Sequence, residues 1–231
     1  MEETQTNKEN APDYPEETLS VTAAIEQLLG RLKEEKQHMD YIKPEMMPDI
    51  DLYMDQVTTF MDTHLESTKR YADDKILTKT MINNYAKNNL LPPPEKKKYS
   101  KDHLLLLTFI YYFKNMLSMN DIQCLLAPIK ENYFHQADSG LTLEDVYREV
   151  FATVEGIQGD VIDDILAKYA LSREKFSSPA LDASSSADEL HDFSFICMLC
   201  YDIFLKKQLV EKIIDKMAEA SAENTGKKKH K

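Results

Sequence analysis

The stretch TKTMINNYAKNNLLPPPEKKKYSK, residues 78–101, places a polar helix, a proline stop and a lysine-rich turn in direct succession. Thr78 or Thr80 can cap this helix, because a threonine hydroxyl accepts a hydrogen bond from an unpaired backbone amide at a helix start. The apolar residues fall on one face of the helix: Met81, Ile82, Tyr85, Ala86 and, at its end, Leu90. Asn89 tolerates the left-handed conformation that ends many helices, and the prolines at 92–94 prevent continuation. We therefore predict a short helix followed by an exposed turn.

The same stretch is basic within an acidic chain. The formal net charge is −12, yet nine Lys or Arg residues face three Asp or Glu residues between Lys69 and Lys101. Such a basic island favours a polymer of phosphates as the partner, so duplex DNA is predicted. The outer helix face offers amide and ammonium groups that suit base edges and phosphates: Lys79, Asn83, Asn84 and Lys87. The turn would hold the DNA backbone through Lys96, Lys97, Lys98 and Tyr99.

A plainer interpretation of these residues stands beside the DNA hypothesis. Lysines and asparagines on the outer face of a helix commonly form only a solvated surface, and a run of three lysines is often a loop without a target. The order of helix, stop, turn and following apolar helix favours the DNA interpretation.

The composition indicates an all-α protein. The chain has 231 residues, is 42% hydrophobic, and contains five glycines and no tryptophan, which favours helices over strands and tight turns. We expect four segments: a disordered lead-in at 1–17, a helix-turn-helix domain with a preceding helix at 18–130, a helical C-terminal region at 131–222 with a Ser-rich loop at 172–188, and a basic tail at 223–231. The sequence shows neither a signal-peptide pattern nor a long apolar run, so we expect a cytoplasmic protein without a membrane partner.

Capping residues and periodicity set the expected helix boundaries. Asp51 is a candidate N-cap, and Ser100 is expected to cap a strongly apolar helix at the centre of the domain. Ser118 should open a short helix that ends before Pro128. The helices outside the opening stretch are expected from residue 18 to the charge cluster KEEKQ at 33–37, and over residues 52–65, 100–117, 118–127, 142–154, 160–170 and 189–222.

Residues 76–126 resemble the DNA-binding module of the MerR group of winged-helix transcription regulators. The matching parts are the recognition helix TKTMINNYAKNN, the exit LLPPP, the basic wing ending KKKYSKDHL, a long apolar helix and the segment SMNDIQCLL. The whole chain, and LTKTMINNYAKN in particular, also resembles an uncharacterised bacterial protein family with such a core. The resemblance implies a winged helix-turn-helix and DNA binding. Asn83, Asn84 and Tyr85 stand where that group usually has Arg-Tyr-Tyr, so a phosphate-binding arginine is missing.

Other candidate sites are weak. The sequence has no glycine-rich phosphate loop, nucleophile elbow or zinc-protease helix, so we expect no enzyme activity and no cofactor. Cys197 and Cys200 lie in the apolar stretch FSFICMLCYDIF, where a cysteine is usually a small buried residue, so we expect no metal site. His64 and His103 are expected to be structural.

The C-terminal half suggests a second kind of contact. Fourteen acidic residues face four basic ones between Glu131 and Cys200, a balance that would keep this half away from DNA. The last helix is apolar over more of its surface than the edge helix of a monomer needs, so it either packs centrally or builds a homodimer. We predict a dimeric DNA-binding regulator of transcription. The alternative is a non-catalytic helical protein-protein interaction module that has lost DNA binding.

Overall fold

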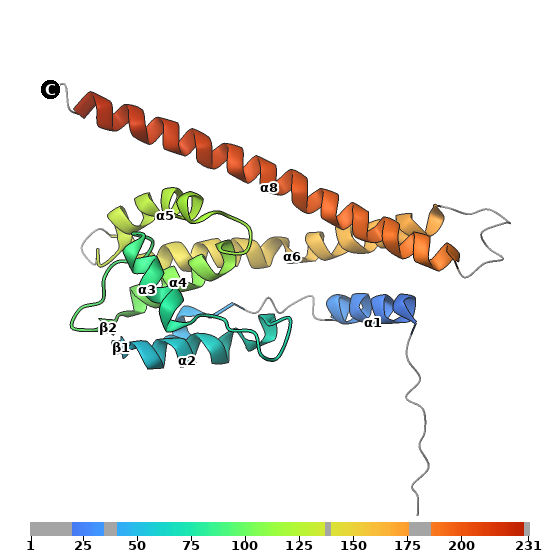
Figure 1. The fold of residues 1–231 in the computed structure, drawn as a ribbon, viewed down its shortest axis with the longest axis horizontal. Coiled ribbons are helices and arrows are strands. Elements are labelled where there is room, and N and C mark those ends of the chain that lie inside the picture. Colours follow the sequence, from blue (N-terminus) through green and yellow to red (C-terminus); the bar gives the residue numbers. More distant parts are fainter. Residues whose placement is uncertain (1–19, 35–40, 137–139, 176–185, 229–231) are drawn as a thin grey trace, which may run out of the picture.

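The computed structural model describes residues 20–34, 41–136, 140–175 and 186–228 of the chain. The described part is all-α, as predicted, with one small sheet (Figure 1). In chain order the elements are α1 (Val21–Glu34), η1 (Pro44–Met46), β1 (Leu52–Tyr53), α2 (Met54–His64), η2 (Glu66–Thr68), α3 (Lys79–Lys87), β2 (Lys98–Tyr99), α4 (Lys101–Phe113), α5 (Met119–Tyr133), α6 (Leu143–Glu174) and α8 (Ser186–Lys228).

Helix α4 forms the centre of the core, which confirms the prediction from its strongly apolar sequence. Every residue from His103 to Tyr111 is buried. Helices α2, α3 and α5 and the start of α6 pack around it. Tyr147 of α6 is fully buried, and its hydroxyl donates a 2.7 Å hydrogen bond to the carbonyl of Ile42. This bond ties the segment before α2 to the first turns of α6.

The two strands form an antiparallel pair in which Leu52 faces Tyr99 and Tyr53 faces Lys98. This sheet is not expected from the sequence, in which Asp51 is the candidate cap of a helix from residue 52. Helix α2 instead begins at Met54, with Tyr53 as its N-cap residue and the Gln56 side chain accepting from the Tyr53 amide at 2.9 Å. The strand pairing fixes the chain before α2 to the chain before α4.

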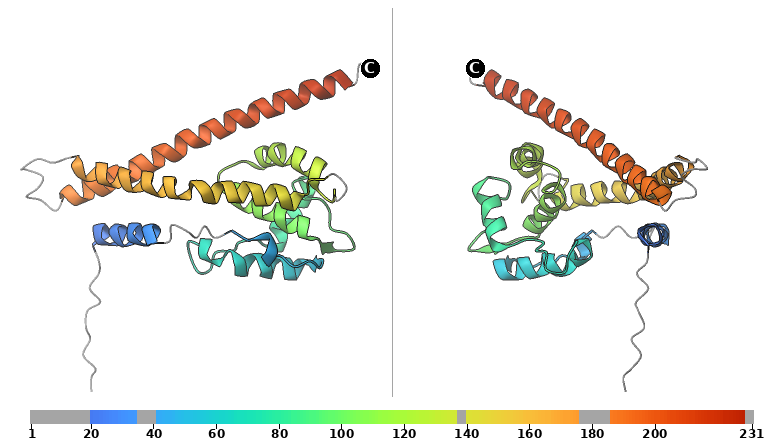
Figure 2. Two further views of the ribbon diagram at one scale, coloured as in Figure 1. Left: turned by 180° about the vertical axis from the view of Figure 1, so that it is seen from behind. Right: turned by 45° about the vertical axis from the view of Figure 1, so that its right-hand side comes forward.

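The long helices extend away from this core (Figures 1 and 2). Helix α6 runs from the core to the far end of the molecule, where it meets α1 and the start of α8. Helix α8 then returns, diverges from α6 and passes beside α5. Cys124 of α5 donates a weak 3.8 Å hydrogen bond to the Ile214 carbonyl of α8.

Several expected boundaries are wrong. Helix α5 continues through Pro128 to Tyr133, and the two helices predicted over 142–154 and 160–170 are the single helix α6. The ends of the expected Ser-rich loop are helical, because α6 continues to Glu174 and α8 begins at Ser186. Helix α8 also continues to Lys228, into the expected tail. The lead-in predicted at 1–17 lies outside the described residues.

Candidate nucleic-acid interface

Helix α3 has the boundaries and the two faces that its sequence predicts. Thr78 caps it, since the Thr78 hydroxyl accepts a 3.2 Å hydrogen bond from the Met81 amide. Ile82 and Tyr85 are buried against the core. The helix ends as expected, with Asn89 in the left-handed region at φ 54°. The core therefore fixes one face of α3 and leaves the other to solvent.

The outer face of α3 carries the predicted polar residues. Lys79, Asn83, Asn84 and Lys87 are all exposed. Lys79 is engaged in an ion pair with Asp55 of α2, whereas Lys87 forms no ion pair with the described residues. The Asn84 carbonyl accepts a 2.8 Å hydrogen bond from the Asn88 side chain, which leaves the Asn84 amide group on the outer surface. Amide groups and one unpaired ammonium are therefore presented together.

Lys96 and Lys97 form the tip of a tight turn before β2. The Lys98 amide donates a 2.8 Å hydrogen bond to the Glu95 carbonyl, so these two lysines are the central residues of the turn. Both have positive φ, at 49° and 66°. Turns of this kind usually hold Asn or Gly, because a side chain in the left-handed region costs about 1–2 kcal/mol. Both side chains are exposed and form no ion pair with the described residues.

Lys98 and Tyr99 differ from the two lysines at the tip. The Lys98 ammonium lies 5.3 Å from the centre of the Tyr53 ring across the sheet, so this lysine is half-buried. Tyr99 is only 3% exposed, and its ring meets the His103 ring edge-on at 5.3 Å. Burial also raises the pKa of Tyr99. The predicted contact of Tyr99 with a DNA backbone does not fit this position, because the side chain belongs to the core.

Two lysines from the core hold the chain segments at either end of α3. Lys114 donates a 2.6 Å hydrogen bond to the Ile76 carbonyl, and Lys130 donates one to the Asn89 carbonyl. Burial lowers the pKa of both ammonium groups. Neither contact could be predicted from the sequence, because each lysine comes from an element that is distant from α3 in the chain. Together they attach the two ends of α3 to α4 and α5, so the position of the exposed face is fixed relative to the core.

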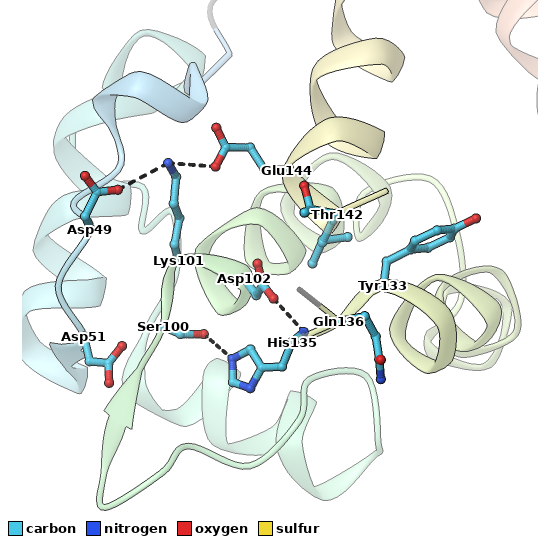
Figure 3. A pocket seen from close by; sticks show the side chains of 11 residues that line it. Asp49, Asp51, Ser100, Lys101, Asp102, Tyr133, His135, Gln136, Thr142 and Glu144 are labelled. Carbon is cyan, nitrogen blue, oxygen red and sulfur yellow. Dashed lines mark hydrogen bonds and ion pairs between the residues drawn. The ribbon is translucent and has the colours of Figure 1, made fainter. Parts of the chain in front are cut away.

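A second candidate site is the acidic hollow of about 480 Å³ between the start of α4, the end of α5 and the start of α6 (Figure 3). Lys101 lies between two carboxylates there, 2.9 Å from Glu144 and 3.5 Å from Asp49. These carboxylates outweigh desolvation, so the pKa of Lys101 is raised. The His135 amide donates a 2.8 Å hydrogen bond to Asp102, as Figure 3 shows. The contacts join three elements around the first turn of α4.

Ser100 and His135 of this hollow, together with the buried His103 behind them, superficially resemble a hydrolase site. The Ser100 hydroxyl lies 2.8 Å from Nδ1 of His103 and 2.9 Å from Nε2 of His135. However, Nδ1 of His103 already accepts a 3.0 Å hydrogen bond from the Ser100 amide, so it carries no proton. The hydroxyl must therefore donate to His103, and it accepts from His135. In this arrangement His135 does not act as a base towards Ser100, and the group serves to cap α4.

The other possibilities considered from the sequence were a metal site, the cysteine pair and a membrane-spanning helix. The described residues contain no group of three or more His, Cys, Asp or Glu side chains placed to hold a metal ion. Cys197 and Cys200 are exposed on α8, which corrects the expectation that they are buried. Among the described helices, none combines the length and the apolar character needed to cross a membrane.

The structure thus defines an all-helical protein whose most distinctive exposed surface is basic and polar, formed by α3 and the turn at residues 95–98. Residues 42–150 match the model of a protein family described as a domain of unknown function (DUF1836). No curated protein and no solved structure matches the chain. The matched segment contains α3, the basic turn and the core around α4, whereas α1 and α8 lie outside it. The match supports the expected resemblance to an uncharacterised protein family, and the MerR-like helix-turn-helix stays a prediction.

Proposed function

We propose that the protein is a DNA-binding regulator of transcription that acts as a homodimer and contacts duplex DNA through α3 and the basic turn. The observation that carries this proposal is the pair of lysines at the turn. Lys96 and Lys97 occupy a left-handed conformation that costs free energy for any residue with a side chain. A costly backbone conformation that presents charge is most readily explained by function, since Asn or Gly would form the same turn more easily.

In this proposal each exposed polar residue has a role that the surrounding geometry supports. Lys96 and Lys97 bind phosphates without regard to sequence, while Asn83, Asn84 and Lys87 reach base edges in the major groove. Lys79 joins them when a phosphate replaces Asp55 as its partner. Lys98 supports the turn from the Tyr53 ring and adds charge. The acidic C-terminal half faces away from the DNA in this arrangement.

The test is a titration of labelled random-sequence duplexes at several salt concentrations. The informative variant is Lys96→Gly with Lys97→Gly, because glycine favours the same turn and removes only the charges. Its affinity should fall by about tenfold, and the slope of log affinity against log salt should decrease by about two. The matched control, Lys212→Ala with Lys216→Ala, removes the same charge from exposed sites on α8 and should change neither quantity.

Two outcomes contradict this proposal. One is an absence of binding at low salt by a folded wild-type protein, and the other is equal binding by the glycine variant. An absence of binding would favour the alternative function, a helical protein-protein interaction module, for which the exposed apolar side chains of α8 are the specific observation. Equal binding by the glycine variant would show that the turn does not contact the DNA. Selection of bound duplexes from the random pool would also give the preferred sequence.

A further inference from the structure

Helix α8 carries two apolar faces along one segment, and only one of them is packed. The packed face meets α6 and α1. Phe195 is buried with its ring edge-on to Tyr169 of α6, and Asp192 is buried where it accepts a hydrogen bond from Thr22 of α1. The other face is exposed, with Phe193 65% exposed, Phe204 52% exposed, and Cys197 and Cys200 between them. An apolar stripe of this size on a monomer indicates a protein interface.

The exposed stripe has the spacing of a helix-pairing seam. It consists of the half-buried Leu190 and the exposed Phe193, Cys197, Cys200 and Phe204, which follow one another at intervals of three, four, three and four residues. This is the alternation by which apolar side chains of one helix insert between those of another. Ile196 and Tyr201 flank the seam on its two sides and are also exposed. The face is therefore shaped for another helix rather than for a flat surface.

The order of residue types along the seam is nearly palindromic. Reversal about the midpoint between residues 198 and 199 exchanges Phe193 with Phe204 and Cys197 with Cys200. A two-fold axis at that midpoint would place phenylalanine on phenylalanine at both ends and small cysteines at the centre. Two-fold interfaces require this self-complementarity, because each surface patch must fit its own copy.

Charges at the ends of the seam select the antiparallel direction. Asp188 and Glu189 lie at one end, and Lys206 and Lys207 lie at the other. Within one chain Asp188 pairs with Arg173, Lys206 with Asp202 and Lys207 with Glu211. Asp188, Lys206 and Lys207 are exposed, so these pairs can be exchanged for contacts with a second copy. Antiparallel pairing brings the acidic end of each helix to the basic end of its partner, with Glu189 and Lys207 on the same edge. Parallel pairing would oppose like charges at both ends, which is destabilising.

We propose that two copies of the protein pair through α8 in an antiparallel arrangement centred between Met198 and Leu199. Phe193 packs on Phe204 of the second copy, Cys197 lies beside Cys200, and Glu189 pairs with Lys207. The contact from Leu190 to Lys207 spans about 26 Å of helix. This inference rests on the proposed homodimer, names its surface and register, and does not depend on DNA binding.

Sedimentation equilibrium without DNA tests the surface. Phe204→Glu should raise the dimer dissociation constant by about thirtyfold or more, because it replaces an apolar contact with Phe193 of the second copy by a charge, at both ends of the two-fold interface. The matched control is Leu209→Glu, since Leu209 lies on the same helix, is 60% exposed and is outside the seam. A monomeric wild-type protein, or a dimer that Phe204→Glu leaves intact, overturns the inference. Circular dichroism establishes that each variant retains its helices.

Cross-linking tests the register. Glu189→Cys and Lys207→Cys are made separately in a chain whose three native cysteines are replaced by alanine and whose dimerisation is first verified. In the antiparallel register the two new thiols meet only between different variants, since identical positions lie more than about 25 Å apart. The mixed sample should therefore form a disulfide under mild oxidation, and neither variant alone should do so. Cross-linking of each variant with itself shows a parallel pair and overturns the register. If the wild-type protein dimerises and cross-links as expected but does not bind DNA, the proposed DNA-binding function is contradicted and the pairing through α8 is not.

Discussion

At the scale of single residues, His103 shows how burial and hydrogen bonding set a protonation state. Its side chain lies in the core and is only 1% exposed. Burial lowers the pKa of His103 to about 4, against a smaller opposing effect of the Pro93 carbonyl. Nδ1 must also stay unprotonated to accept the Ser100 amide. The prediction of a structural role for His103 is confirmed, and its neutral form is part of that role.

Stability should therefore depend on pH through His103. Below about pH 6.5 the unfolded chain binds a proton at this ring while the folded chain does not, so the free energy of unfolding falls as pH falls. The loss should reach about 3 kcal/mol near pH 4, where the folded ring also begins to protonate. Urea denaturation at pH 7, 6, 5 and 4 measures this slope. His103→Gln, which keeps a side-chain acceptor, should lower stability at pH 7 but flatten the slope; an unchanged slope would assign it to other groups.

At the scale of elements, the predictions from sequence were most accurate where a single physical cause determines the structure of a helix. Thr78, Asn89 and the three prolines fix α3 through local backbone preferences, so its start and end were predicted correctly. The strongly apolar sequence of α4 likewise predicted that this helix is central. Exposure of the lysine and asparagine side chains also followed from periodicity. Whether a given lysine forms an ion pair could not be predicted from periodicity, because Asp55 reaches Lys79 from another helix.

The errors occurred where tertiary packing outweighs local preference. Pro128 normally interrupts a helix at a cost of about 3 kcal/mol, yet α5 continues past it. Ile122 and Leu126 before the proline are buried, and Lys130 after it is bonded to Asn89. Packing on both sides therefore holds the last turn of α5. The exposed cysteines were missed for a related reason, since an apolar stretch does not reveal which of its faces has a partner.

Gly156 and Gly159 lie inside α6, where they weaken the helix without a steric need. An added Cβ at either position would meet no atom within 4 Å, and neither residue has positive φ. Gly156→Ala and Gly159→Ala should therefore each raise the free energy of unfolding by about 0.5–1 kcal/mol, through lower backbone entropy of the unfolded chain. Thermal and urea denaturation of each single variant measure the gain. A loss of stability would show that a close contact, or flexibility of α6, depends on these glycines.

At the scale of the whole molecule, the two proposed surfaces lie on different elements and can be separated. The basic surface belongs to the core of α2–α5, whereas the pairing seam belongs to the part of α8 that adjoins α6 and α1 (Figure 2). In the proposed model of function, the acidic C-terminal region serves assembly and the basic island serves DNA contact. A dimer held by α8 would carry two copies of α3, each able to occupy one half-site.

This separation predicts how loss of the dimer affects DNA binding. For a duplex with two half-sites from the selected pool, Phe204→Glu should lower affinity by about a hundredfold, because the second half-site is then no longer bound within the same assembly. For a duplex with one half-site, Phe204→Glu should leave affinity within about twofold of wild type, since α3 and the turn are unchanged. Fluorescence anisotropy with both duplexes measures the two values, with Leu209→Glu as the control. An equal loss on both duplexes would mean that the substitution damages the DNA-binding surface itself, and the two surfaces would then not be independent.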